Sequence, residues 1–240
     1  RPADLSNREF FTPEEAASRN AATSVDRPPQ PGSVGNYNAL WFDRGTIDPS
    51  LRTSLIIDPP DGRLPLTQET QARIASEREY RDSHPADSWL DRSPWDRCIT
   101  YHGVPPVSTG YNNTYHILQT PDVVAIHVEN IHDVRIIPIG DQSRLDGAIR
   151  QWNGDSRAHW EGDTLVVETT HFNDRAFIRN FNGNLSRELH VVERFRRAGP
   201  DVLDYEFTVS DPATWTAPWS GSLPMSTSEG PMFEYACHEG

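Results

Sequence analysis

Five side chains that can move protons or hold charge lie close together in the segment Val123–Ile139, VVAIHVENIHDVRIIPI. Strand alternation puts His127 and Glu129 on one face, and apolar residues on both faces indicate a strand that is covered on both sides. Buried ionisable groups need partners, and Arg135 can pair with Glu129 across a predicted turn. This predicts acid–base catalysis in which His132 transfers the proton, Glu129 supports it, and Arg135 holds a carboxylate or developing oxyanion.

Two other interpretations of the segment stay open. The first is structural: a buried Glu129–Arg135 ion pair beside a turn histidine. The second is a metal site that uses His127, Glu129 and His132, with His238 as a further ligand. His-x-Glu on a strand resembles the ligand spacing of β-barrel metal sites, and the cofactor would then be a single divalent metal. The acid–base interpretation needs no cofactor.

A second charged segment is Gly154–Asp163, GDSRAHWEGD. In a functional interpretation Asp155 faces the mouth of a pocket beside Arg157, as the catalytic counterpart of His132. Trp160 and Glu161 would then contact substrate. A β-hairpin explains the same residues as turn and cross-strand partners.

The only two cysteines are Cys98 and Cys237. A disulfide between them would hold the C-terminus against the start of a β-rich region and fit an oxidising compartment, whereas two unrelated buried thiols are the alternative. With the bridge, His238 is held near this region and is a second candidate catalytic group. Alternatively, the bridge only fixes the C-terminus, and the charged side chains there are solvated.

Residues 111–115 (YNNTY) precede the first strand of this region. Asn113 and Tyr115 could donate hydrogen bonds to a sugar and stack on it, although Asn-Asn is also an ordinary turn. The seven tryptophans could stack on sugars or phenolic rings, or pack in the core.

The charge balance excludes several functions. All 22 cationic residues are arginine, and the net charge is −13. Lysine-based chemistry is therefore excluded, and neither nucleic acid nor an anionic membrane is an expected partner. No apolar run is long enough to span a membrane, and the chain has no dinucleotide-binding or P-loop motif.

The chain divides into two parts. Residues 1–97 are polar and Pro-rich, with predicted helices over 12–20 and 67–83 and a short strand over 53–58. Residues 98–240 alternate short apolar runs with turns. The predicted strands lie near 115–120, 122–131, 133–139, 148–153, 157–160, 164–170, 189–197, 202–209 and 231–236. Successive hairpins predict a mainly β fold: an antiparallel β-barrel or strongly curved meander sheet, lipocalin-like in plan, with residues 1–97 wrapped around it.

Several long motifs in this chain resemble those of a known group of proteins. They are RTSLIIDPPDGRLP, YNNTYHILQTPDVV, E-x-x-H-D-x-R, GDSRAHWEGDTLVVETTHFND and the terminal YACHEG. From about Phe10 to the end, the chain resembles an uncharacterised family of secreted proteins from soil and aquatic bacteria. The resemblance implies export and a shared site, without a reaction. His116 and His171 depart from the family pattern, in which Gln and Asn are usual. The motifs contain the candidates Glu129, His132, Arg135, Asp155, Arg157, Glu161 and His238.

The sequence therefore predicts a secreted or periplasmic enzyme that performs acid–base hydrolysis, elimination or isomerisation on a small glycosidic or phenolic molecule. The alternatives are a lipocalin-like carrier without catalysis and a metalloenzyme. Because the chain begins Arg1-Pro2 without methionine, we expect a mature product from which a signal peptide has been removed.

Overall fold

The structure is a computed structural model that describes residues 3–5, 8–23, 45–84, 86–110, 112–178, 185–235 and 237. The Pro-rich segment 27–32 and Trp41 lie outside the described residues. The N-terminal part contains the short 3-10 helix η1 (Ala3–Leu5), the helices α1 (Pro13–Thr23) and α2 (Gln68–Ser83), the strand β1 (Ile56–Asp58) and the 3-10 helix η3 (Trp89–Asp91). Both predicted helices are confirmed.

Both helices begin at a threonine cap. The Thr12 hydroxyl accepts a hydrogen bond from the Glu15 backbone N–H, and the Glu15 carboxylate accepts one from the Thr12 N–H. Thr67 caps α2 in the same way by accepting from the Thr70 N–H at 3.1 Å. These bonds satisfy backbone donors that a helix start leaves unpaired. Each helix buries a single residue, Ala16 in α1 and Thr70 in α2, so both lie on the surface.

The larger sheet is an antiparallel meander with seven strands. Its order is β1-β9-β8-β7-β6-β5, and β10 pairs with β8. The strands after β1 are β5 (Asp155–Glu161), β6 (Thr164–Thr170), β7 (His190–Arg197), β8 (Val202–Ser210), β9 (Trp219–Ser222) and β10 (Met225–Ser226). Strand β1 comes from the N-terminal part and pairs with β9, so residues before Cys98 complete one edge of this sheet.

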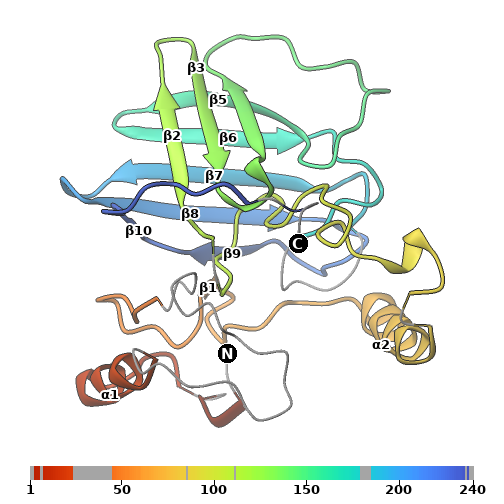
Figure 1. Ribbon diagram of the computed structural model, residues 1–240, viewed down its shortest axis with the longest axis horizontal. Helices are drawn as coiled ribbons and strands as arrows, with labels where there is room; N and C mark the ends of the chain where they lie inside the picture. The colour runs from red at the N-terminus through yellow and green to blue at the C-terminus, as the bar shows by residue number, and fades with distance from the viewer. Residues whose placement is uncertain are drawn as a thin grey trace.

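The smaller sheet has the order β2-β3-β4 and crosses one face of the larger sheet (Figure 1). It is made of β2 (Tyr115–Gln119), β3 (Val123–Val128) and β4 (Val134–Pro138), and the 3-10 helix η4 (Asn130–His132) joins β3 to β4. Val124, Ile126 and Ile137 are buried in the core together with residues of β5 to β9. Polar side chains that lie between the two sheets are thus enclosed by a sheet on each side.

The outer face of β3 is more open than we expected. Its alternate residues Val123, Ala125 and His127 are half-buried, whereas Val124, Ile126 and Val128 are buried. The expected partial burial of His127 and burial of Glu129 are confirmed, but the outer face is covered less completely than the core face. The apolar run therefore reflects one core face and one face that is partly covered in the described part of the chain.

Most of the predicted strands are confirmed, including the hairpin between β5 and β6. Two are not: residues 148–153 form only an isolated bridge at Gln151, and no strand is found over residues 231–235. The 148–153 segment contains apolar residues, but Ile149 is exposed and its backbone N–H bonds to the nearby Asp146 carbonyl. Strands β9 and β10 were not predicted.

The fold is thus mainly β and antiparallel, as predicted, with sheets of seven and three strands. A closed barrel is not detected among the described residues, and the lipocalin-like plan stays a prediction. No helix in the described ranges is long and apolar enough to cross a membrane.

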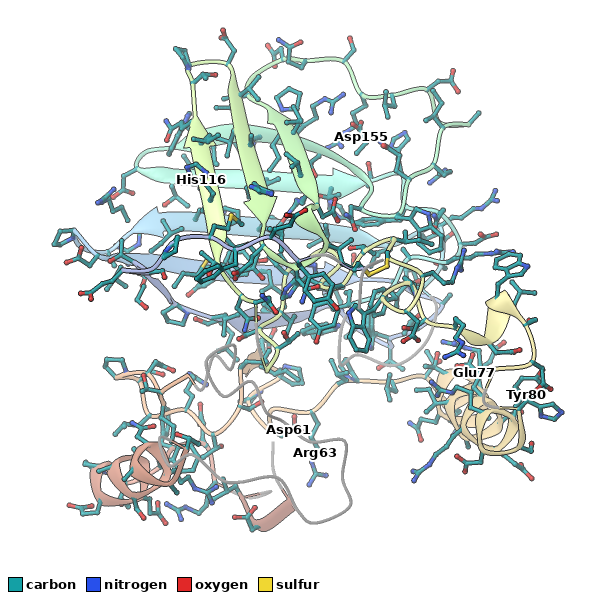
Figure 2. The ribbon with its side chains drawn as sticks, in the orientation of Figure 1. Asp61, Arg63, Glu77, Tyr80, His116 and Asp155 are labelled. Atoms are coloured by element: carbon teal, nitrogen blue, oxygen red, sulfur yellow. A yellow bond between two sulfur atoms is a disulfide. The ribbon has the colours of Figure 1, made fainter. Side chains whose placement is uncertain are left out.

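The predicted disulfide is present. Cys98 and Cys237 are bonded across a sequence separation of 139 residues, with Cα atoms 6.0 Å apart (Figure 2). Close by, the Trp95 indole N–H donates to the Tyr235 hydroxyl at 3.1 Å. The C-terminal segment is therefore fastened to the loop that precedes β2. A disulfide of this kind is typical of a compartment outside the cytoplasm.

Candidate functional site

The E-x-x-H-D-x-R motif forms the connection between β3 and β4. Within it, Ile131 has φ 61° and ψ 12°, a left-handed conformation that is rare for a β-branched residue. Such a conformation costs on the order of 1–3 kcal/mol and is maintained by surrounding structure. Here the Ile131 side chain is buried, and the tight turn places Asn130 and Asp133 beside one pocket.

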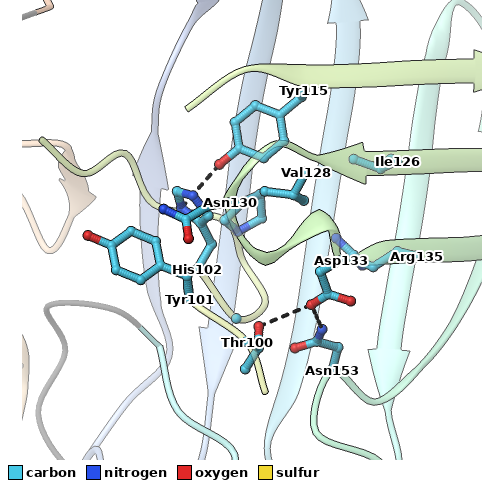
Figure 3. A pocket seen from close by; sticks show the side chains of 12 residues that line it. Thr100, Tyr101, His102, Tyr115, Ile126, Val128, Asn130, Asp133, Arg135 and Asn153 are labelled. Atoms are coloured by element: carbon cyan, nitrogen blue, oxygen red, sulfur yellow. Dashed lines mark hydrogen bonds between the residues drawn. The ribbon is translucent and has the colours of Figure 1, made fainter. Parts of the chain in front are cut away.

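This pocket lies at the end of the small sheet, against the loop that follows Cys98 (Figure 3). Its cavity measures about 10 Å³, which is room for about one water molecule. Polar and aromatic side chains dominate the lining. The lining residues are Thr100, Tyr101, His102, Gly103, Pro106, Tyr115, Ile126, Val128, Asn130, Asp133, Arg135 and Asn153.

Asn130 is the most unusual member of the lining. The residue is 1% exposed, and neither its amide nitrogen nor its amide oxygen has a hydrogen-bond partner among the described residues. A buried amide without partners costs on the order of 1–3 kcal/mol per group. An amide in this position can supply both a donor and an acceptor to a small polar ligand.

Asp133 contributes a carboxylate that is already oriented. Thr100 Oγ1 donates to Asp133 Oδ2 at 3.1 Å, and Asn153 Nδ2 donates to the same oxygen. Within the described part of the chain, Oδ1 receives no hydrogen bond. Asp133 is a half-buried residue, and only one of its two carboxylate oxygens has hydrogen-bond partners among the described residues.

A histidine and a tyrosine form another wall of the pocket. His102 Nδ1 lies 2.9 Å from the carbonyl oxygen of Val107 and 3.3 Å from the Tyr115 hydroxyl. Because a carbonyl oxygen only accepts hydrogen bonds, Nδ1 carries the proton and shares it with the phenol oxygen. This contact fixes the Tyr115 ring against the pocket, and Tyr115 is a predicted substrate-binding residue that does line it.

Arg135 has a different partner from the one expected. Its Nη1 donates to Glu193 Oε1 at 3.0 Å and its Nη2 to Glu193 Oε2 at 2.6 Å. Nη2 also donates to Ser156 Oγ at 3.1 Å. The predicted pair with Glu129 is therefore wrong, and Glu193 on β7 neutralises the guanidinium between the two sheets. Arg135 lines the pocket, and its Nε is buried without a hydrogen-bond partner among the described residues.

The Tyr205 hydroxyl completes this buried network by donating to Glu193 Oε1 at 3.0 Å. Burial and the neighbouring Glu193 carboxylate raise the pKa of Tyr205 well above its ordinary value, and Arg135 opposes them. The phenol therefore stays protonated in the folded protein at pH values that ionise it in the unfolded chain.

Tyr205 is expected to make stability fall at alkaline pH. Above the ordinary tyrosine pKa of about 10, the unfolded chain loses a proton that the folded protein keeps, so the free energy of unfolding decreases as pH rises. In Tyr205→Phe this contribution is absent, and the decrease between about pH 9 and 11 should be smaller than in the wild type. Urea unfolding across this range measures the slope; equal slopes would contradict the prediction.

The Glu129 carboxylate links two backbone segments through hydrogen bonds. Its Oε2 accepts from the Thr114 backbone N–H at 3.2 Å and its Oε1 accepts from the Phe233 N–H at 3.1 Å. The carboxylate thus joins the start of β2 to the C-terminal segment. Both oxygens are engaged, and Glu129 is absent from the pocket lining.

Asp155 and Arg157 do lie together, as predicted, but they hold a loop. Arg157 Nη1 donates to Asp155 Oδ1, and the other Asp155 oxygen accepts from the Leu145 N–H at 3.1 Å. Arg157 also donates to the Ser143 carbonyl. Figure 2 labels Asp155 beside this loop, and neither residue lines the pocket of Figure 3.

The remaining predicted substrate contacts are apart from the pocket. Trp160 is exposed, and Glu161 pairs with Arg194 at 2.6 Å on the outer face of the large sheet. Asn113 hydrogen-bonds Thr109 in a local turn, with its Oδ1 accepting from the Thr109 N–H at 2.8 Å.

No group of three or more metal-ligating side chains is found among the described residues. The side chain of His132 and the whole of His238 lie outside those residues. His127 is on the outer face of β3, away from the buried Glu129 carboxylate.

Sequence reasoning missed several residues of the pocket. Asn130 and Asp133 stand inside the motif that drew attention to the segment, and their amide and carboxylate were the available signal. The His102 loop gave a weaker signal, namely its closeness to Cys98. Nothing local pointed to Glu193, which lies 58 residues after Arg135.

Comparison of the chain with protein-family models, with curated proteins and with solved structures finds no match in any of the three.

Proposed function

We propose that the protein is a secreted or periplasmic enzyme that hydrolyses a small phenolic substrate by acid–base chemistry in the pocket beside Asn130. The observation that carries this proposal is the buried Asn130 amide, unpartnered among the described residues, in the same pocket lining as a carboxylate with hydrogen-bond partners on one oxygen only. Unsatisfied buried polar groups are rare in folded proteins and call for an explanation such as a ligand. The disulfide supports the extracytoplasmic location.

The size of the cavity favours hydrolysis over elimination or isomerisation. It accommodates about one water molecule, so a nucleophilic water fits and a whole sugar does not. In the proposed step, Asn130 holds the water and Asp133 Oδ1 takes its proton as the water oxygen attacks the substrate carbon. The bond to the leaving phenolic oxygen then breaks, and that oxygen receives the proton from Asp133.

Two features favour a phenolic substrate over a glycosidic one. Glycoside hydrolysis generally uses two carboxylates across the scissile bond, and Asp133 is the one carboxylate among the described lining residues. The rings of Tyr101 and Tyr115 line the pocket. They provide an aromatic surface beside the half-exposed mouth at Asp133 and Asn153, where a phenolic ring could pack.

Asp133→Asn is expected to reduce kcat by about 10²–10⁴-fold, because an amide cannot accept the proton. Aryl esters and aryl glycosides serve as the probe panel, and turnover in ¹⁸O-labelled water shows whether solvent oxygen enters the product. Asp141→Asn, in an exposed loop near the end of β4, is the matched control and should retain full activity.

Three results would overturn the proposal: no turnover of any probe by the wild type, full activity in Asp133→Asn, or an activity that a chelator abolishes. A lipocalin-like carrier is the second candidate, because Ile126, Val128 and Pro106 give one side of the pocket apolar walls. A carrier would bind phenols without turnover, and Asp133→Asn would leave the affinity almost unchanged.

A further inference from the structure

Two histidines lie side by side on the outer face of the small sheet. In the ladder between β2 and β3, His116 is directly opposite His127. Residues directly opposite on antiparallel strands share a face, with Cβ atoms about 4.5–5.5 Å apart. His116 is exposed (labelled on β2 in Figure 2) and His127 is half-buried. Both imidazoles therefore project from the sheet on the side opposite to the buried Ile126 and Val128 of the pocket.

Neither imidazole has another role in the described structure. No hydrogen bond or ion pair joins His116 or His127 to a described side chain, and the other outward positions of the three strands carry no charged group. These neighbours are Leu118, Val123, Ala125, Val134, Ile136 and Pro138. Among the described residues, the two rings thus have nitrogen atoms free to bind a ligand, and no neighbouring side chain competes for it.

We propose that His116 and His127 together bind a divalent transition metal of the zinc, copper and nickel group. Imidazole nitrogen is a favoured ligand for these ions. The two ligands stand on paired strands whose register is fixed over five residue pairs, so little ordering is needed on binding. Two protein ligands leave further coordination positions open to solvent.

This site differs from the metal site considered on sequence grounds. The earlier set joined His127 to Glu129 and His132, yet both carboxylate oxygens of Glu129 accept backbone N–H groups. Cross-strand register gives His127 a different neighbour, His116. The site is also independent of the hydrolytic pocket, so either proposal can fail while the other holds.

The test is titration of the full-length, chelator-treated protein with Cu²⁺ and, separately, Zn²⁺. We expect one equivalent to bind the wild type, with a copper electron paramagnetic resonance spectrum that shows two nitrogen ligands. Removing one ligand, in His116→Gln or His127→Gln, should weaken the affinity by about 10–100-fold or more. His159→Gln is the matched control, because His159 is an exposed strand histidine beside Glu161, and it should bind like the wild type.

Equal affinity in the wild type and in both single variants would overturn the proposal, and so would the absence of binding. Loss of binding in His132→Gln with retention in His116→Gln would move the metal to the β3–β4 connection and overturn it too. Thermal unfolding of each variant without metal checks the fold. Because His116 is exposed, its replacement should leave this unfolding almost unchanged.

Discussion

Replacing Glu193 with glutamine is expected to lower the free energy of unfolding by about 3–5 kcal/mol, which is the usual cost of removing one partner of a buried ion pair. Glu193 is fully buried, and its carboxylate is the anion that faces the Arg135 guanidinium between the two sheets. Without it, the guanidinium keeps its charge in a low-dielectric core. Urea denaturation of the wild type and Glu193→Gln measures the difference.

Two further variants separate the ion pair from the general effect of a substitution. In the double variant Arg135→Met, Glu193→Leu both charges are removed, and stability should recover towards that of the wild type because apolar groups replace a desolvated pair. Asp174→Asn breaks the exposed pair with Arg187 and should change stability little. If Glu193→Gln were as stable as the wild type, the ion pair would not make the expected contribution to the free energy of unfolding.

The second large effect is expected from the disulfide. The double variant Cys98→Ser, Cys237→Ser should lose about 2–5 kcal/mol of stability, because the bridge restricts a long loop in the unfolded chain. The loss should be largest near the C-terminus, where residues 231–235 have no strand pairing in the described structure. Chemical denaturation gives the size, and hydrogen exchange shows whether the Phe233 amide loses its protection.

Reduction of the wild-type protein is the control for this variant. It should reproduce the loss of stability without any substitution, and reoxidation should restore it. A variant as stable as the oxidised wild type would show that the bonds of Glu129 to Phe233 and of Trp95 to Tyr235 hold the segment by themselves.

The strands that the sequence predicts well are those with a local pattern. β8 alternates buried Tyr205, Phe207 and Val209 with outward residues, and the tight turn at Gly162 defines the hairpin of β5 and β6. Strand β9 reads WSGS and has no such pattern. It is a strand because β1 and β8 pair with it, and this pairing depends on tertiary structure.

The candidate site was also hard to predict, because it too depends on contacts between distant strands. Sequence proximity suggested Glu129 as the partner of Arg135, whereas the two sheets bring Glu193 there from another strand. The motif segment does contribute to the pocket, since its Asn130, Asp133 and Arg135 all line it. What could not be predicted is which motif residues turn inward, because the left-handed Ile131 interrupts strand alternation after Val128.

The bridge between Cys98 and Cys237 also has a mechanical consequence. All strands from β2 to β10 lie between the two cysteines, so covalent bonds connect the borders of this region directly. A pulling force applied at the chain ends would pass through the bridge and bypass these strands. Of the described strands, only β1 would carry the load, by separating from β9. Under tension, the protein should extend its N-terminal part first and keep the pocket intact until the bridge is reduced.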